Sequence, residues 1–227
     1  MIHTNHDKKI NILTKNFKNG KQINMDVTKT KSKNKIIKNL MPNTNSSTIK
    51  VQKRDGRLES LDINKIHFVV EEACEGLTGV SSSQIEMNAN IQFYDGMTTK
   101  DIQNVLVRSA NDLISLDAPN YQYAAARLLS YDVRKEAHGQ YEYIPLLKLI
   151  LRNIRLGVYD KGILDKYTKT ELKKFNTWIR RDRDLKFTYA GLRQICDKYL
   201  VQDRSSGQIY ETPQDMYMMI AATLFAE

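Results

Sequence analysis

The sequence predicts a mainly helical fold with small β elements. Apolar residues recur at helical spacing through most of the chain after residue 62. Strand-like patterns are short and lie around Asp55-Gly56 and Ser206-Gly207, where hairpin turns are expected. The chain has 227 residues, of which 41% are hydrophobic and 27% charged, so it has room for one large or two small soluble domains.

The first 48 residues differ from the rest in composition and charge. They are rich in Lys, Asn, Thr and Ser, and such a segment cannot bury enough apolar surface to offset the entropy lost on ordering. Of the 35 basic and 26 acidic residues in the chain, 11 Lys and two Asp lie in residues 1–50, which leaves 24 of each sign in the remainder. We therefore expect residues 1–48 to be a disordered basic extension, with a phosphate-binding arm as the alternative.

Residues 49–139 predict a β-hairpin followed by four helices. The hairpin turns at Asp55-Gly56. Asp62 is placed to cap the first helix, one of Ser81–Ser83 the second, and Thr98 the third, while Gly139 ends the fourth. The four helices are expected at residues 63–77, 83–94, 99–114 and 120–137.

Residues 141–227 predict a second, mostly helical region. Helices are expected at residues 143–157, 167–179 and 214–225, with a charged loop and a helix at 181–200 and a hairpin at 201–211. The broad apolar face of the helix at 143–157 favours packing on neighbouring helices over a membrane-surface role. The chain ends directly after an apolar helix without a cap, so we expect the sequence to be interrupted there.

Composition and motifs disfavour several classes of function. No segment approaches the roughly 18 consecutive apolar residues of a membrane span, and the N-terminus lacks the apolar core of a secretory signal. Cys74 and Cys196 have no partner at metal spacing, and neither do the four His residues. No P-loop, dinucleotide-binding, nucleophile-elbow or zinc-protease motif is present. The sequence therefore predicts two reduced, partly buried thiols, no metal site, and no catalytic centre within these residues.

Phosphate-capable groups gather around the predicted hairpin. Basic residues lie at Lys53-Arg54, at Lys65 in the first turn of a helix, and at Arg134-Lys135 near the end of another. Thr99 lies at a helix N-terminus, where free N–H groups favour an anion. The candidates for apolar walls around a base are Val51, Leu61, Ile66 and Phe93. Taken singly, these residues also fit solvated helix ends and a helix cap, so spacing alone leaves both interpretations open.

The order of several longer motifs narrows this choice. The segments VQKRDGRLESLDINKI, IQFYDGMTTKDI, LISLDAPNYQYAAARLL and VRKEAHGQY resemble the ATP-cone of class I ribonucleotide reductase large subunits. The segments GVYDKGILDKYTKTEL, RDRDLKFTYAGLRQI and KYLVQDRSSGQIYETPQDMY are similar to the segment that opens the catalytic domain of the same family. The resemblance covers about residues 50–227 and leaves only the N-terminal extension outside it.

The resemblance implies an ATP-cone regulatory domain at residues 49–140, in which a small sheet caps a four-helix bundle. It implies an incomplete, helical N-terminal part of the catalytic domain at residues 141–227. The family's cone binds ATP as activator and dATP as inhibitor, and Mg²⁺ is expected with the nucleotide. The nucleotide-binding residues that it implies are Lys53, Arg54, Glu59, Ser60, Leu61, Asp62, Ile63, Asn64, Lys65, Thr99 and Lys135, with Val51, Ile66 and Phe93 as adenine pocket walls.

Two positions depart from the family's pattern. Well-studied bacterial members have Asn where this chain has Asp62, and His where it has Gln103. A carboxylate at position 62 would repel a triphosphate or accept a hydrogen bond from a ribose hydroxyl. Both changes therefore bear on the distinction between ATP and dATP.

The resemblance also implies partners. The family's thiyl-radical and redox cysteines and its specificity loops lie further along the chain, and Cys74 and Cys196 do not match them. We therefore expect a complementary C-terminal polypeptide of the large subunit, a radical-generating small subunit, an oligomer, and neither membrane nor nucleic acid. The expected location is the cytoplasm, which is a host cytoplasm if the gene belongs to a phage. The alternatives are a stand-alone ATP-cone module, a non-functional truncated reductase, and a protein that binds nucleic acid through its extension.

Overall fold

A computed structural model describes residues 49–226, so the predicted extension at 1–48 lies outside the described residues. The described part is mainly helical with one small sheet, which confirms the predicted fold class. Its N-terminal half contains β1 (Lys50–Gln52), β2 (Leu58–Ser60), α3 (Ile63–Cys74), α4 (Ser82–Asn90), β3 (Met97–Thr98), α5 (Thr99–Asp112) and α6 (Tyr121–His138). Its C-terminal half contains α7 (Leu146–Arg155), α8 (Ile163–Lys166), α9 (Lys169–Trp178), the 3-10 helix η1 (Arg181–Lys186), α10 (Tyr189–Lys198) and α11 (Pro213–Leu224).

The strand β1 is the central strand of a three-stranded sheet. It pairs antiparallel with β2 across the predicted turn, with Val51 opposite Glu59. Gly56 in that turn has a φ of 86°, a left-handed conformation that glycine adopts without a Cβ clash. The strand β3 pairs in parallel with β1 and thereby brings the start of α5 beside the hairpin. The sequence does not predict this third strand, because two residues directly before a helix show no alternation.

The helices of the N-terminal half begin at the predicted caps. The side chains of Asp62, Ser81 and Thr98 each accept a hydrogen bond from a backbone N–H in the first turn of α3, α4 and α5. Gly139 follows α6 with a φ of 72° and ends it in the left-handed conformation, as predicted. The helix α4 ends at Asn90, earlier than the expected residue 94.

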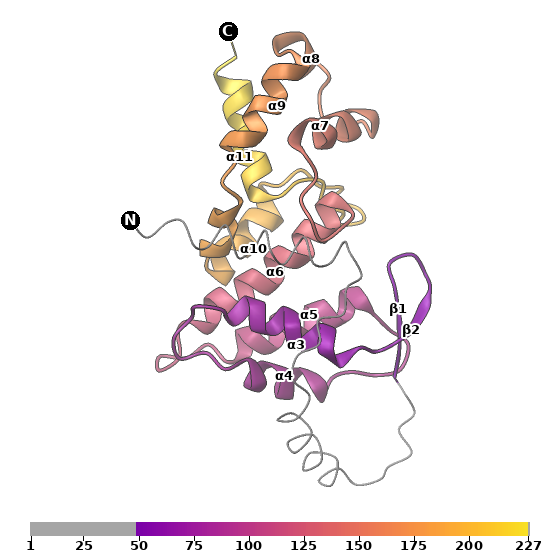
Figure 1. Cartoon of the computed structure of the whole chain (residues 1–227), viewed down its shortest axis with the longest axis vertical. Coiled ribbons are helices and arrows are strands. Elements are labelled where there is room, and N and C mark those ends of the chain that lie inside the picture. The colour runs from indigo at the N-terminus through magenta and orange to yellow at the C-terminus, as the bar shows by residue number, and fades with distance from the viewer. Residues whose placement is uncertain (1–48, 227) are drawn as a thin grey trace, which may run out of the picture. The chain divides into compact units, whose positions relative to one another are not determined.

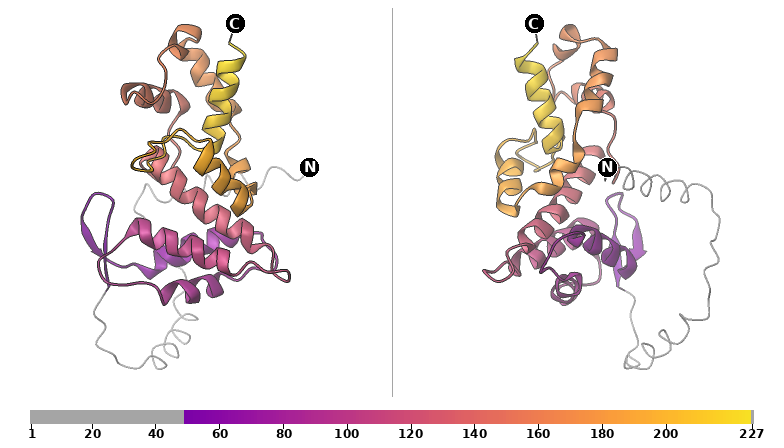
Figure 2. Two further views of the ribbon diagram at one scale, coloured as in Figure 1. Left: turned by 180° about the vertical axis from the view of Figure 1, so that it is seen from behind. Right: turned by 60° about the vertical axis from the view of Figure 1, so that its left-hand side comes forward.

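The helix α6 connects the two halves. It packs on α3 and α5 in the N-terminal half and on α10 and η1 in the C-terminal half, and Figures 1 and 2 show it running between them. Leu128 on α6 is fully buried, and burying such a side chain contributes about 1.5–3 kcal/mol. The same apolar core continues into Leu192 and Cys196 of α10. The predicted regions 49–140 and 141–227 therefore share a core.

A second apolar core lies between α7, α9 and α11. Its fully buried members include Leu146, Leu149, Ile150 and Leu172. These three helices agree with the predicted ones, whereas the four-residue helix α8 is not predicted. The hairpin expected at residues 201–211 is reduced to a single antiparallel bridge.

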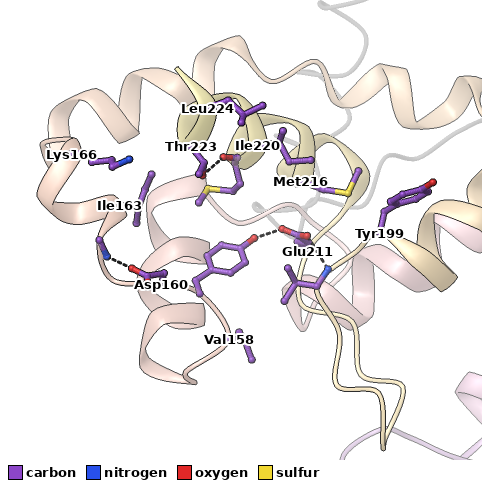
Figure 3. Close-up of a pocket in the computed structure, with 14 residues that line it drawn as sticks. Val158, Asp160, Ile163, Lys166, Tyr199, Glu211, Met216, Ile220, Thr223 and Leu224 are labelled. Carbon is purple, nitrogen blue, oxygen red and sulfur yellow. Dashed lines mark hydrogen bonds between the residues drawn. The ribbon is translucent and has the colours of Figure 1, made fainter. Parts of the chain in front are cut away.

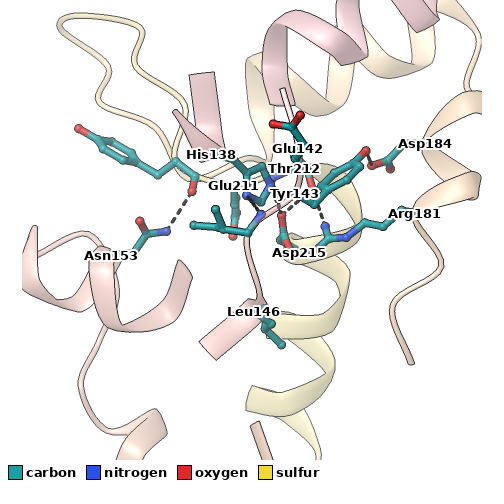
Figure 4. Close-up of polar contacts among 12 residues, drawn as sticks. His138, Glu142, Tyr143, Leu146, Asn153, Arg181, Asp184, Glu211, Thr212 and Asp215 are labelled. Atoms are coloured by element: carbon teal, nitrogen blue, oxygen red, sulfur yellow. Dashed lines mark hydrogen bonds and ion pairs between the residues drawn. The ribbon is translucent and has the colours of Figure 1, made fainter. Parts of the chain in front are cut away.

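A buried polar network joins the end of α6 to η1 and α11 (Figure 4). Asp215 Oδ2 lies 3.2 Å from His138 Nε2, and Asp215 Oδ1 lies 2.6 Å from Arg181 Nη2. The imidazole Nδ1 of His138 accepts a hydrogen bond from the backbone N–H of Ile144, so Nε2 carries the proton that faces Asp215. Although burial alone would raise it, hydrogen bonds from His138 and Arg181 hold the pKa of Asp215 well below its ordinary value.

Other side-chain chemistry is sparse in residues 49–226. This part of the chain contains no helix of the length and apolarity needed to cross a membrane. It also contains no group of three His, Cys, Asp or Glu side chains arranged to hold a metal ion. The two cysteines are free thiols, and burial raises the pKa of Cys74 to about 11 and that of Cys196 to about 12.

Candidate functional site

A cavity of about 460 Å³ opens where the hairpin, α3, α5 and α6 converge. Its volume lies in the range of small-molecule sites. The hairpin forms one wall, the first turns of α3 and α5 contribute others, and the end of α6 closes the space. The lining residues are Val51, Lys53, Arg54, Asp55, Arg57, Glu59, Ser60, Leu61, Asp62, Lys65, Ile66, Val69, Thr99, Ile102, Gln103, Leu106, Lys135 and Gly139.

Local structure places the basic and hydroxyl side chains at this convergence. Lys53 directly follows β1, and its backbone N–H donates to the carbonyl of Arg57 at 2.8 Å across the hairpin turn. Lys65 lies in the first turn of α3 and Thr99 is the first residue of α5. Lys135 lies in the last turn of α6. The hairpin and the adjacent start of α3 therefore meet the more distant α5 and α6 at one cavity.

Most of the predicted nucleotide residues line this cavity. They are Val51, Lys53, Arg54, Glu59, Ser60, Leu61, Asp62, Lys65, Ile66, Thr99 and Lys135. Ile63, Asn64 and Phe93 are not among its lining residues. Ile63 is 61% exposed, and Phe93 packs against the apolar core. From α3, the residues that line the cavity are Lys65, Ile66 and Val69.

Most of the cations around the cavity are already paired with carboxylates. Lys53 Nζ lies 3.2 Å from Glu59 Oε2, and Lys65 Nζ lies 3.7 Å from Asp62 Oδ2. Arg54 Nη2 lies 2.6 Å from Asp132 Oδ1 on α6. Among the described residues, the ammonium of Lys135 forms no ion pair within 4.0 Å.

Burial and neighbouring charge act together on Lys135. Burial lowers its pKa, and the positive charges of Arg54, Arg134 and Lys53 lower it further, while Asp132 opposes the effect. An anion in the cavity would add negative charge beside this ammonium and would raise its pKa again. The cavity therefore favours a negatively charged ligand.

Gln103 is held as a fixed hydrogen-bond acceptor on the wall. The side chain is 6% exposed, and its Nε2 donates to the backbone carbonyl of Leu128 at 2.8 Å. A carbonyl oxygen only accepts hydrogen bonds, so Nε2 of Gln103 must face Leu128 and the amide oxygen Oε1 points away from it. Asp62 is occupied differently, because its carboxylate caps α3 by accepting from the N–H of Asn64 at 3.0 Å.

Arg134 differs from its neighbour Lys135. Its guanidinium carbon lies 5.2, 4.1 and 4.9 Å from the ring centroids of Tyr131, Tyr141 and Tyr143. Its guanidinium therefore faces these tyrosine rings rather than the cavity. Of the two phosphate-capable residues near the end of α6, only Lys135 lines the cavity.

A larger cavity, of about 610 Å³, lies in the C-terminal half (Figure 3). Its wall is largely apolar and includes Ile163, Met216, Met219, Ile220 and Leu224. Lys166 is the one basic residue among those that line it. Tyr159 donates a hydrogen bond from its hydroxyl to the carboxylate of Glu211 at its edge. With a single cation, this cavity is poorly suited to a triphosphate.

Asp132 is a charged residue beside the first cavity that sequence reasoning missed. Its side chain is 9% exposed and contacts the site through Arg54 rather than by lining the cavity. It lies one helical turn before Lys135, and that spacing is a signal that the two side chains share a face of α6.

Family models match both halves of the described chain. A model described as the ATP cone domain matches residues 49–136. A model described as the all-alpha domain of ribonucleotide reductase matches residues 185–227. These matches bear out the resemblance drawn from the motifs.

Several curated relatives are similar over most of this chain. Ribonucleoside-diphosphate reductase 1 subunit alpha of Salmonella typhimurium is 46% identical over 181 residues, which cover 80% of this chain and 24% of the relative. Its counterpart in Escherichia coli is 47% identical over 78% of this chain and 23% of the relative. The subunit alpha of Enterobacteria phage T4 is 41% identical over the same shares. The chain thus spans about a quarter of the length of these relatives, and through their N-terminal region it belongs to the ribonucleotide reductase large-subunit family.

Proposed function

We propose that the cavity at the hairpin binds ATP or dATP as an allosteric effector. The observation that carries the proposal is Lys135, a cation at the cavity with no ion pair among the described residues. Lys53 and Arg54 stand beside it on the hairpin. A triphosphate supplies the negative charge that this group lacks, through charge-assisted hydrogen bonds.

The remaining lining residues divide by chemistry. Val51 and Ile66 offer buried apolar surface against which a purine base can pack. Thr99 opens a 14-residue helix whose free N–H groups favour phosphate. The amide oxygen of Gln103 can accept from a ribose hydroxyl or from the exocyclic amine of adenine. Mg²⁺ would arrive with the nucleotide, held by its phosphate oxygens.

We infer that the chain contributes the regulatory end of a ribonucleoside-diphosphate reductase used for deoxyribonucleotide synthesis. Residues 49–140 would be the regulatory domain and residues 141–227 the start of the catalytic domain. The names of the relatives support the reaction, and the remaining three quarters of their length would supply the chemistry. The enzyme would act in the cytoplasm, which is a host cytoplasm if the gene belongs to a phage.

Such a chain needs partners. The partners we propose are a complementary large-subunit polypeptide and a radical-generating small subunit. The apolar cavity beside α11 supports the first, because a polypeptide can cover surface that no other described segment covers. Nucleotide in the cone would act by binding two assembly states with different affinity.

Calorimetric titration of ATP and dATP into the full chain tests effector binding. Saturable binding is expected, and the double variant Lys53→Ala/Lys135→Ala should lose it, since each charge-assisted contact is worth about tenfold or more in affinity. The matched control is Lys148→Ala/Lys173→Ala, which removes two lysines from a groove elsewhere on the surface. Equal binding by the two double variants, or no binding by the folded parent chain, would refute the proposed function.

A further inference from the structure

Asp132 holds Arg54 from behind the cavity wall. The two side chains are 2.6 Å apart, with Arg54 40% exposed and Asp132 9% exposed. Arg54 lines the cavity and Asp132 does not. The carboxylate would therefore act on a bound nucleotide through the guanidinium.

The geometry of the pair leaves Arg54 free to bind a second anion. A guanidinium has five N–H donors in a fixed plane, and the hydrogen bond to Asp132 uses only Nη2. The other nitrogens remain for a phosphate. A buried carboxylate is strongly destabilising without its partner, so the pair should persist when the cavity is filled.

Asp132 also faces Lys135 along α6. The hairpin presents Lys53 and Arg54 to this ammonium, and α6 itself adds Arg134 and Asp132. The loop after α6 adds the ring of Tyr141, with its centroid 5.6 Å from Nζ. Among these groups around Lys135, the carboxylate of Asp132 is the one that carries a negative charge.

We propose that Asp132 is a positioning residue of the effector site. Its carboxylate holds Arg54 against the cavity and offsets the repulsion between the adjacent cations Arg54 and Lys135 before nucleotide binds. This inference rests on the proposed function. It requires that Asp132→Asn, which keeps the shape and removes the charge, makes Lys135 lose its proton at lower pH. ATP affinity should then fall at lower pH than in the parent chain.

The test is the pH profile of ATP binding to the full chain, measured by calorimetry between about pH 7 and pH 10. In D132N the midpoint of the alkaline fall in affinity should move down by about one pH unit, a tenfold change in the proton equilibrium. Asp132→Glu should restore the parent profile. Glu136→Gln is the matched control, because Glu136 pairs with Lys100 at 3.4 Å and should leave the midpoint unchanged.

A second readout separates this inference from the proposed function. The titration of the Lys135 ammonium, followed by NMR without nucleotide and assigned with Lys135→Met, should move to lower pH in D132N. If D132N does not fold, Asp132→Ser, which also removes the carboxylate, serves instead and should likewise move the titration to lower pH. An unchanged Lys135 titration overturns the role of Asp132 whether or not ATP binds. A shifted titration without any ATP binding would refute the effector site alone.

Discussion

Two polar clusters lie one helical turn apart at the end of α6, and they differ in how completely their charges are paired. Lys135 faces the cavity, which five basic and three acidic side chains line. His138 enters the buried network, where Asp215 is fully buried between two cationic or N–H donor groups. Buried charges that are matched hold elements together, whereas an open surplus of one sign attracts a ligand. Substitutions in the two clusters should therefore affect different properties.

The largest effect is expected from Asp215→Asn in the buried network. The substitution leaves Arg181 without its carboxylate, and breaking a buried pair costs about 3–5 kcal/mol. The free energy of unfolding from urea denaturation measures it. Asp182→Asn, which breaks an exposed pair with Arg180, serves as the control and should change stability by less than about 1 kcal/mol. Similar losses in the two variants would show that the network contributes no more than a surface ion pair.

Lys135→Ala should give the opposite pattern in the open cluster. ATP affinity should fall by about tenfold or more, because a charge-assisted contact is lost. The free energy of unfolding should change by less than about 1 kcal/mol, since this ammonium breaks no ion pair when removed. Calorimetric titration and urea denaturation of the same preparation provide both numbers. A large loss of stability with unchanged affinity would place Lys135 with the structural cluster.

The buried polar network should also make the stability of the protein depend on pH, through Asp184. Burial, with a contribution from Asp215, raises the pKa of Asp184 from its ordinary value of 3.8 to about 7. Between these two pKa values the folded state holds a proton that the unfolded chain releases. The contribution of Asp184 to the free energy of unfolding is therefore full below about pH 4 and is lost as the pH rises toward about 7. The loss should be on the order of 1 kcal/mol for each pH unit in this window.

Asp184→Asn provides the control for that dependence, because the amide stays neutral at every pH. Thermal melts of both proteins across the same pH range isolate the contribution of this carboxyl. The parent chain should lose stability relative to D184N as the pH rises, and the difference should become constant above about pH 8. Parallel profiles would mean that Asp184 is ionised in the folded protein throughout.

Features set by local chemistry could be predicted from the sequence. Asp62, Thr98 and Gly139 were assigned as helix ends from residue type and position, and the structure confirms all three. The lysines at 53 and 135 could be assigned because they lie at a predicted turn and a predicted helix end and because the family's motifs match. Local rules therefore give the elements, and the family resemblance gives most of the lining residues.

Features set by tertiary packing could not be predicted. Parallel pairing of β3 with β1 depends on where the chain returns after α4. The separation of Arg134 from Lys135 depends on which face of α6 meets the tyrosines. The contact between Arg54 and Asp132 joins residues 78 positions apart. Sequence patterns indicate which side chains share a face of a helix, but they do not indicate which other element packs against that face.

The smallest effect is expected from Glu59→Gln, and it separates two kinds of carboxylate at the open cluster. Glu59 is 39% exposed and pairs with Lys53, so it competes with phosphate for that ammonium. Removing its charge should raise ATP affinity by about twofold to fivefold, the size of an exposed ion pair. Calorimetry at the same alkaline pH should show a higher ATP affinity for E59Q and a lower ATP affinity for D132N than for the parent chain. A loss of affinity in E59Q would mean that this carboxylate, like Asp132, positions its cation rather than competing for it.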